Sequence, residues 1–478
     1  MIWVPEIATI PLVGPPQQRS TGTGDQRYVN VLFEKSVNEP LKEQSVYCVK
    51  RPGLSNNTQP PGGAAAGRGI YAWDASTKLY SVFADDIYSV VTVIATALAT
   101  TSGRVWITQL PASSGARQLV LSDGTDNYNI TTADAVTQID ENDDAQYPTP
   151  NTGPIDYLDG YLFQGLSNGQ LWQCDLNSAV AWTVGAYLSV DTHGGPLEAH
   201  KLLKDQIVAF TKNRVEFFFN NGNPSGSVLL RIDQNTIMNG IASKNSLAWS
   251  GETLCYVSEN SSDGDGGRNV MLIAPGKAAE IGTPFINRFL AAEGTSISTC
   301  SAFMERVAGH LCYVLNLDSA ERTFVYDLTS GEWTEWEAAA GSAKFPGVSA
   351  ASMSGTIYVQ DAANGRTYTL SPTVYQDSGS NFTVTVQTGR HMLNKGKPFR
   401  VTNCELVADT QASGTTSLLL CGDDNTTFTT IGSFDNTVTT KRIPAGGWFE
   451  THVIARLTHA ANTAWRAQAL RLTWEPCA

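Results

Sequence analysis

Charged residues are scarce in this sequence, and basic residues are the scarcer kind. Asp, Glu, Lys and Arg make up 16% of the 478 residues, against roughly 25% in an ordinary globular domain. The chain carries 32 Lys and Arg against 45 Asp and Glu, which gives a formal charge of −13. No basic surplus exists to neutralise phosphates, so ordinary DNA or RNA binding is not expected. An acidic wall would instead let DNA slide past without sticking.

Long apolar runs, a signal peptide and cysteine motifs are also missing. No stretch of 18 apolar residues could span a membrane, and the N-terminus MIWVPEIATIPLVGPP has prolines in place of a basic, uninterrupted leader. We therefore expect a protein that is made in a cytoplasm and stays soluble. The cysteines show no C-x-x-C spacing and are predicted to be reduced thiols, mostly in apolar strands: Cys48, Cys174, Cys255, Cys300, Cys312, Cys404, Cys421 and Cys477.

Catalytic and metal-binding constellations are missing as well. The sequence has no G-x-S-x-G, H-E-x-x-H, Walker loop or strand-linked G-x-G-x-x-G. Its histidines are scattered, and the nearest pairs are seven residues apart, which places them on opposite faces of a strand: His193, His200, His310, His391, His452 and His459. We predict no catalytic residues, no cofactor and no metal site, and hence no enzyme.

Acidic turns are the remaining candidates for a site. Asp263 and Asp265 lie in the Gly-rich loop 261–269 and could offer two oxygen ligands to calcium. The further ligands of an EF-hand do not follow, so a solvated hairpin tip is favoured over a calcium site. Turns 121–129 and 420–430 are faintly similar to the Asp-box turn of sialidase propellers but lack its full pattern. Asp-rich β-turns explain them better.

Turn residues are abundant, with 42 Gly and 21 Pro. A unit of two β-rich runs around a polar turn recurs along the chain, and its starts lie near Ile70, Arg117, Ile155, Leu202, Leu247, Ser301 and Val348. Repeats of about 40–50 residues with short antiparallel strands are typical of propeller blades. We predict an all-β fold with a β-propeller of six or seven blades, with a pair of β-sandwiches as the alternative.

Local signals predict a few elements within this pattern. Asn-Gly or Asp-Gly pairs predict tight hairpins at 158–161, 167–170 and 363–366. One short helix is predicted over 283–294, with Thr283 as N-cap and Pro284 at the first helical position. Segment 90–101 is ambiguous between strand and helix.

Composition divides the chain into three regions. Residues 1–69 contain PP, RPGL and NNTQPPGGAAAGRG, which predict an extended strap with a flexible joint. Residues 70–370 hold the repeated units of the propeller. After a polar break near residue 371, alternating runs through 371–478 predict a C-terminal β-sandwich.

An ordered set of segments resembles a known family. YVNVLFEKSVNEPLKEQSVYCVKRPGL (28–54) is similar to its opening, and the strongest similarity covers 200–260. The segments 284–290, 301–317, 324–336 and 469–474 follow in the same order. The family is that of the packaged-DNA stabilisation, or tail nozzle, proteins of P22-like short-tailed bacteriophages. Residues 85–150 match nothing in that order, and we interpret them as an inserted projection.

The resemblance implies a function and partners. It implies a homohexameric ring in the virion tail, assembled in the host cytoplasm, which extends the DNA channel below the portal and adaptor. The ring would retain packaged DNA and mount the needle, fibres or tailspike. The sequence does not assign the interface residues. Two alternatives stay open: a carbohydrate-binding or glycoside-cleaving propeller, and a propeller scaffold of cellular origin.

Overall fold

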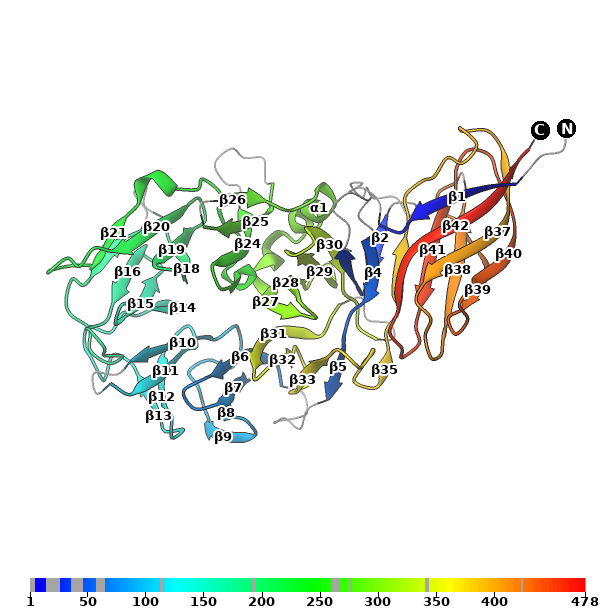
Figure 1. Cartoon of the computed structure of the whole chain (residues 1–478). Coiled ribbons are helices and arrows are strands. Elements are labelled where there is room, and N and C mark those ends of the chain that lie inside the picture. The colour runs from blue at the N-terminus through cyan, green and yellow to red at the C-terminus, as the bar shows by residue number, and fades with distance from the viewer. Residues whose placement is uncertain are drawn as a thin grey trace.

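The protein is elongated, with a β-propeller at one end and a β-sandwich at the other (Figure 1). The structure is a computed structural model that describes residues 5–13, 26–35, 46–56, 65–111, 115–190, 195–259, 267–275, 277–339, 344–422 and 424–477. Strands dominate this part of the chain because short alternating apolar runs are separated by Gly, Asn and Asp turns.

The first three blades are four-stranded antiparallel meanders. Blade 1 consists of β6 (Gly67–Trp73), β7 (Lys78–Phe83), β8 (Asp86–Ser89) and β9 (Thr92–Ala95). Blade 2 consists of β10 (Trp106–Pro111), β11 (Arg117–Ser122), β12 (Asn127–Thr131) and β13 (Val136–Ile139). Blade 3 consists of β14 (Asn151–Leu158), β15 (Tyr161–Leu166), β16 (Gln170–Gln173) and β17 (Tyr187–Ser189).

Blades 4 and 5 continue the ring. Blade 4 consists of β18 (Leu197–Leu203), β19 (Gln206–Thr211), β20 (Val215–Asn220) and β21 (Leu229–Arg231), followed by η1 (Asp233–Asn235). In blade 5 two short strands share the inner edge of β24 (Thr253–Glu259): β22 (Gly240–Ile241) and β23 (Ala248–Ser250), separated by η2 (Lys244–Ser246). β25 (Val270–Ala274) and β26 (Lys277–Glu280) complete this blade.

Blades 6 and 7 close the ring. Blade 6 consists of β27 (Ser301–Val307), β28 (His310–Leu317), β29 (Arg322–Asp327) and β30 (Glu332–Glu335). Blade 7 combines β31 (Gly347–Met353), β32 (Thr356–Asp361) and β33 (Thr367–Ser371) with the N-terminal strand β5 (Gly53–Asn56). β31 lies against β6 of blade 1. A strand from the start of the chain therefore fastens the last blade.

The blade count is seven, which agrees with the seven recurring units in the sequence. Six of the predicted unit starts lie on or directly before the innermost strand of a blade, as Ile70 does in β6. Arg117 is the exception, because it begins β11, the second strand of blade 2. The three predicted hairpins are confirmed, and their Gly160, Gly169 and Gly365 all have positive φ.

Residues 85–150 are not an inserted projection. They contain β8 to β13, which complete blade 1 and form blade 2 inside the ring. The unit predicted near Arg117 belongs to blade 2, and its Leu119, Val120 and Leu121 are fully buried in β11. The ambiguous segment 90–101 contains β9 and is otherwise without regular structure.

The predicted helix is confirmed as α1 (Pro284–Ala292), followed by η3 (Gly294–Thr299). The Thr283 side chain accepts a hydrogen bond from the Ile286 N–H and Pro284 occupies the first turn. Ile286 and Leu290 are buried against blades 5 and 6, so the helix packs where these two blades meet.

The sandwich has two sheets with one apolar core between them. The strands after the propeller are β34 (Gln376–Asp377), β35 (Ser380–Asn381), β36 (Val384–Gln387), β37 (Phe399–Ala408), β38 (Thr415–Cys421), β39 (Phe428–Asp435), β40 (Lys441–Phe449), β41 (Ile454–His459) and β42 (Arg466–Pro476). One sheet has the order β3-β4-β42-β37-β40, and β1 also pairs with β42. The other runs β2-β36-β41-β38-β39.

The N-terminal strands join sheets that are formed by later strands of the same chain. β1 (Glu6–Pro11) and β4 (Val46–Lys50) pair with β42, β2 (Arg27–Val29) pairs with β36, and β3 (Val31–Lys35) pairs with β4 at the edge of the same sheet. β2 also pairs in parallel with β30, so one nine-stranded sheet runs from blade 6 into the sandwich. The described residues of 1–69 thus do not form the extended strap that the sequence predicted, because the apolar side chains of β1, β3 and β4 lie in the sandwich core and β5 belongs to blade 7.

We predict that Leu54→Ala destabilises the protein by about 2–5 kcal/mol, because the cavity opens in the core of blade 7. Leu54 is 1% exposed and packs in a cluster with Trp336 and Leu370. Urea unfolding followed by tryptophan fluorescence measures the change. Ser55→Ala, on the half-buried face of the same strand, is the matched control. Equal unfolding midpoints for the two variants would contradict the role of β5 in closing the ring.

Candidate functional site

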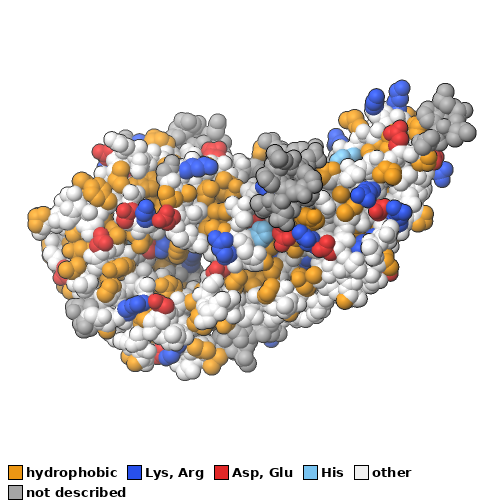
Figure 2. Space-filling view, in the orientation of Figure 1, with side chains coloured by type: hydrophobic (Ala, Val, Ile, Leu, Met, Phe, Trp, Pro, Cys, Tyr) orange, Lys and Arg blue, Asp and Glu red, His pale blue; other side chains and the backbone are white. Residues whose placement is uncertain are grey.

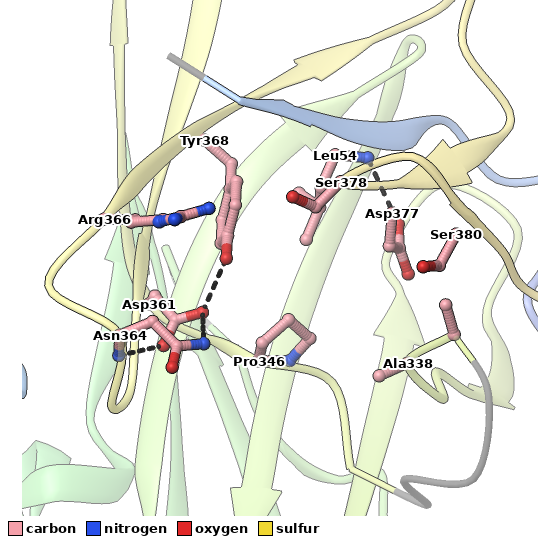
Figure 3. Close-up of a pocket in the computed structure, with 11 residues that line it drawn as sticks. Leu54, Ala338, Pro346, Asp361, Asn364, Arg366, Tyr368, Asp377, Ser378 and Ser380 are labelled. Atoms are coloured by element: carbon pink, nitrogen blue, oxygen red, sulfur yellow. Dashed lines mark hydrogen bonds between the residues drawn. The ribbon is translucent and has the colours of Figure 1, made fainter. Parts of the chain in front are cut away.

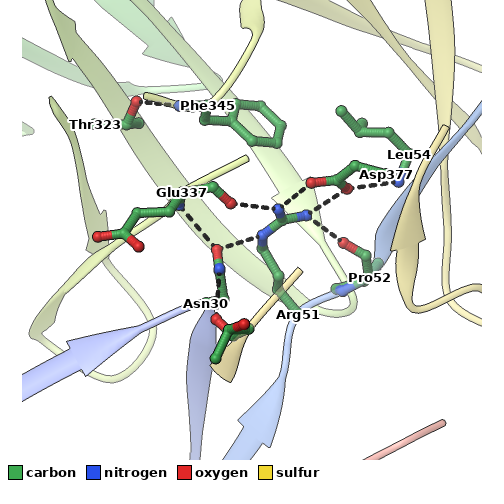
Figure 4. Close-up of polar contacts among 9 residues, drawn as sticks. Asn30, Arg51, Pro52, Leu54, Thr323, Glu337, Phe345 and Asp377 are labelled. Carbon is green, nitrogen blue, oxygen red and sulfur yellow. Dashed lines mark hydrogen bonds and ion pairs between the residues drawn. The ribbon is translucent and has the colours of Figure 1, made fainter. Parts of the chain in front are cut away.

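A buried arginine lies where the propeller meets the sandwich (Figure 4). Arg51, between β4 and β5, is fully buried. Its two terminal nitrogens donate to the two carboxylate oxygens of Asp377, at 3.1 and 2.6 Å. This bidentate geometry is the strong form of an arginine–carboxylate pair.

The other donors of Arg51 are also satisfied. Its Nε donates to Asn30 Oδ1 at 2.8 Å, and its terminal nitrogens reach the carbonyls of Pro52 and Glu337 at 2.9 and 3.0 Å. Asn30 has φ of 58° and receives a second bond, from the Glu337 N–H. Asn and Gly tolerate this left-handed backbone conformation best. It lets the Asn30 Oδ1 atom accept hydrogen bonds from both Arg51 Nε and the Glu337 N–H.

Aromatic rings surround the guanidinium. It lies 3.9 Å from the ring centre of Phe382, 5.1 Å from that of Phe345 and 5.6 Å from that of Trp336. These rings exclude water, so the charge–charge and cation–π contacts act at low dielectric. The cluster joins three segments: the N-terminal strands, the connection from blade 6 to blade 7, and the start of the C-terminal region. We call it the junction.

A second charged contact reinforces the junction. Arg27 on β2 pairs with Glu335 of β30 at 3.2 Å and with Glu337 at 2.6 Å. Nearby, His310 Nδ1 lies 2.8 Å from Asp327 Oδ2, and Lys35 of β3 donates to the Ser330 carbonyl at 3.0 Å. Blade 6 is therefore held to the N-terminal strands by both its sheet edge and its outer turn.

A cavity of about 600 Å³ lies beside the junction (Figure 3). Its walls come from β5, blade 7 and residues 377–380. Tyr368 donates to Asp361 at 2.9 Å, and the Asp361 carboxylate also caps the turn at Ala363 and Asn364. The polar groups on this wall already hold one another, and they position the β32–β33 turn.

The propeller axis holds a smaller cavity of about 340 Å³. It is lined by the inner strands β6, β10, β23, β27 and β31. Arg104 stacks on Trp106, 4.2 Å from its ring centre, and Trp106 stacks on Trp249. A volume of this size suits a small molecule and is far too small for a duplex whose major groove alone is about 12 Å wide. This cavity cannot hold duplex DNA.

The carbohydrate alternative gains no support from the axial cavity. Among the described residues that line it, Glu305 carries the single carboxylate, whereas glycoside hydrolysis ordinarily uses a pair about 5–9.5 Å apart.

The structure separates the histidines named from the sequence. His200 is fully buried, with Nε2 3.0 Å from the Phe163 carbonyl, and burial lowers its pKa to about 4. The ring of His459 stacks on that of Trp465, and His452 Nε2 lies 2.7 Å from Asn425 Oδ1. His193 lies outside the described residues. Among the described residues no three His, Cys, Asp or Glu side chains come together as metal ligands.

The acidic turns have structural explanations where they are described. Asp123 Oδ1 accepts the N–H groups of Thr125 and Asp126, and Asp424 Oδ1 accepts those of Thr426 and Thr427. Both are Asx-type turns. Asp263 and Asp265 lie outside the described residues.

The cysteines are free thiols, as predicted. Seven are buried and Cys477 is half-buried. Burial raises the pKa of Cys174 to about 12, so this thiol stays protonated and unreactive at neutral pH.

Sequence reasoning did not find the junction. Arg51 stands in the noted RPGL segment, but its partner Asp377 lies 326 positions away, and no local pattern links them. No helix in the described part of the chain has the length and apolar character needed to cross a bilayer.

Comparison with solved structures returns propeller-sized partial matches. They include a catalytically inactive virginiamycin B lyase from Staphylococcus aureus (12% identity, 68% of this chain and 98% of that chain, TM-score 0.43). The N-terminal domain of Nup159 (12%, 72% and 98%, TM-score 0.39) and U3-55K (10%, 67% and 99%, TM-score 0.41) also match. At these scores the likeness supports no inference about activity. No curated protein matches the chain.

The fold and the junction define a class: a β-propeller fixed to a β-sandwich through a buried polar cluster. The family described as "Bacteriophage P22 Gp10, beta-propeller" matches residues 10–375. The chain belongs to this family of phage stabilisation proteins. It is therefore a structural component of a phage virion that serves packaged-DNA stabilisation.

We predict that Arg51→Met costs about 3–5 kcal/mol of stability, because it leaves the Asp377 carboxylate buried without its partner. The double variant Arg51→Met/Asp377→Leu should recover much of this loss. Urea unfolding of both variants and of Asp377→Leu alone completes the cycle. Additive losses in the double variant would show that the two side chains do not act as a pair.

The His310–Asp327 pair should make stability depend on pH. The hydrogen bond to Asp327 raises the pKa of His310 above its usual value near 6.5. The stabilising contribution is therefore complete below about pH 6.5 and is lost as pH rises through the raised folded-state pKa. We expect His310→Gln to lose more stability at pH 6 than at pH 9, measured by urea unfolding. The difference should vanish in an Asp327→Asn background; its persistence there would contradict the pairing.

Proposed function

We propose that copies of this chain form a ring in the tail of a short-tailed phage, the nozzle that continues the DNA channel below the portal and adaptor. Membership of the P22 Gp10 family supports this proposal. The ring is a hexamer that contacts the adaptor above and carries the needle, fibres or tailspike below. Its role is structural, and it is assembled in the host cytoplasm before joining the virion.

The observation that carries the proposal is the small size of the cavity at the propeller axis. Because the axial cavity of about 340 Å³ cannot pass duplex DNA, a channel requires several copies around a common centre. Heterologous contacts that close after a full rotation produce such rings.

The charge distribution suits a channel wall. Residues 70–370 contain 16 Lys and Arg against 32 Asp and Glu, a formal charge of −16, so the rest of the chain carries +3. A ring that turns part of this acidic surface inward would repel the DNA backbone and let it slide. Retention of DNA would then come from mechanical closure and not from adhesion.

The test is electron microscopy and light scattering of the purified full-length chain, alone and with the adaptor protein of the same phage. We expect ring-shaped particles of six copies, at least when the adaptor is present. A chain that stays monomeric and does not bind the adaptor would overturn the proposal. Glycan-array binding and glycan-hydrolysis assays should both be blank.

A further inference from the structure

The acidic and basic residues of the chain are segregated at its two ends. Residues 118–200, which make up most of blades 2 and 3, contain 12 Asp and Glu and no Lys or Arg. Residues 378–404 of the sandwich show the reverse, with four Lys and Arg and no Asp or Glu. Blades 2 and 3 lie at the end of the propeller that is far from the sandwich (Figure 1).

The acidic end has a compact loop between β13 and β14. This loop carries Asp140, Glu141, Asp143 and Asp144, and the side chains of Glu141 and Asp143 are exposed. The structure gives no ion pair to any of the four within the described residues. Asp140 and Asp144 use their carboxylates to hold backbone N–H groups of the loop itself. The carboxylates of Asp140 and Asp144 are thus fixed in place, and no Lys or Arg side chain in the described part of the chain pairs with them.

Exposed apolar side chains lie next to this loop. The Trp182 N–H donates to Asp144 at 2.8 Å, and the Tyr147 and Trp182 rings pack edge to face at 6.0 Å. The same segment presents Val180 and Val184, which are 45% and 71% exposed. We call Asp140, Glu141, Asp143, Asp144, Val180 and Val184 the acidic face.

The sandwich presents a surface of opposite charge. The loop between β36 and β37 carries exposed Arg390, Lys395 and Lys397, and exposed Arg400 follows at the start of β37. Figure 2 shows Lys and Arg side chains gathered on the sandwich end. None of the four has an ion pair among the described residues. Of the four, Arg400 has an acidic residue directly across the sheet, because it is paired with Glu475 in the register of β37 and β42.

This basic surface also has apolar anchors. Met392 is 69% exposed and Trp448 is 60% exposed. Trp448 pairs with Arg400 in the register of β40 and β37, so their side chains share one side of the sheet. We call Arg390, Met392, Lys395, Lys397, Arg400 and Trp448 the basic face.

The mixture of charge and apolar anchors favours a protein partner. Exposed valines, methionine and tryptophan add nothing to the repulsion or the binding of a phosphate backbone, but they are the side chains that protein interfaces bury. Charge complementarity on the rim of such an interface fixes which partner binds and in what orientation. The two faces lie at opposite ends of one chain, so they can meet only between copies.

We propose that the acidic face of one copy binds the basic face of the next copy, head to tail. The proposal rests on the ring proposed above and names the surfaces that form it. A contact between two different faces is heterologous, and repetition of it generates a closed ring when the rotation per copy is right.

Charge reversal and charge exchange test the contact in the full-length chain. The acidic-face variant is Glu141→Lys/Asp143→Lys, and the basic-face variant is Lys395→Glu/Lys397→Glu. Each should weaken self-association at least about tenfold, because like charges then meet across the interface. The variant with all four changes restores opposite charges and should associate close to the wild-type level. Sedimentation velocity over a concentration series measures each assembly, and higher salt should weaken the wild-type contact.

Matched controls separate the contact from net charge and from folding. Asp205→Lys/Glu252→Lys reverses two exposed acids on turns of blades 4 and 5, and Lys204→Glu/Lys277→Glu reverses two exposed lysines of the propeller. Both controls should associate as the wild type does. Equal melting temperatures across the set show that every variant folds.

The outcomes separate this contact from the ring itself. If the wild type forms rings while either face variant still associates normally, or the four-change variant stays dissociated, the contact is wrong and the ring stands. If the wild-type chain is monomeric at every concentration, the proposed contact between the acidic and basic faces is overturned. Electron micrographs of the chain with the adaptor then test whether a ring forms. Binding of duplex DNA that is lost in Lys395→Glu/Lys397→Glu without any change in self-association assigns the basic face to DNA and also overturns the proposal.

Discussion

The bidentate pair of Arg51 and Asp377 is the constraint on which the arrangement of the two domains depends. A buried ion pair adds little net stability over an apolar pair of the same shape, but removing one partner leaves the other charge buried and unpaired, which is strongly destabilising. The stacked Phe382 ring and the amide of Asn30 leave the guanidinium one geometry. Together with the nine-stranded sheet through β30 and β2, the pair makes a hinge between propeller and sandwich costly, so the two ends of the molecule keep one relative orientation.

That orientation is coupled to the closure of the chain on itself. β5 completes blade 7, and β1 to β4 complete both sheets of the sandwich with strands made hundreds of residues later. Arg51 stands between these two roles, directly after β4 and just before β5. Neither domain reaches its final form without the N-terminal strands, and such long-range pairing slows folding.

Local signals in the sequence predicted the repeated architecture well and the long-range closure poorly. Asp159-Gly160 and Thr283-Pro284 each act within a few residues, so the hairpin and the helix start were readable. The unit predicted at Arg117 contains β11 and β12 of blade 2, but the first strand of this blade, β10, was missed. The junction could not be read, because the Arg51–Asp377 pairing depends on how seven blades bring position 377 back to position 51, and a single sequence carries no record of that contact.

The small cavity at the propeller axis and the segregated charge together suit this propeller to the wall of the proposed DNA channel. Arg104, Trp106 and Trp249 stack on the wall of the axial cavity. The close-packed cores between neighbouring blades make the propeller stiff, so force applied to one face is carried across the blades. The junction then carries it into the sandwich without a hinge. In the proposed ring this rigidity would matter more than affinity for DNA, since an acidic wall would give DNA nothing to bind, and the contacts between copies would have to oppose the pressure of the packaged genome. Such contacts require surfaces with opposite charge and apolar anchors held at fixed separation, which is what a stiff joint between the two ends provides.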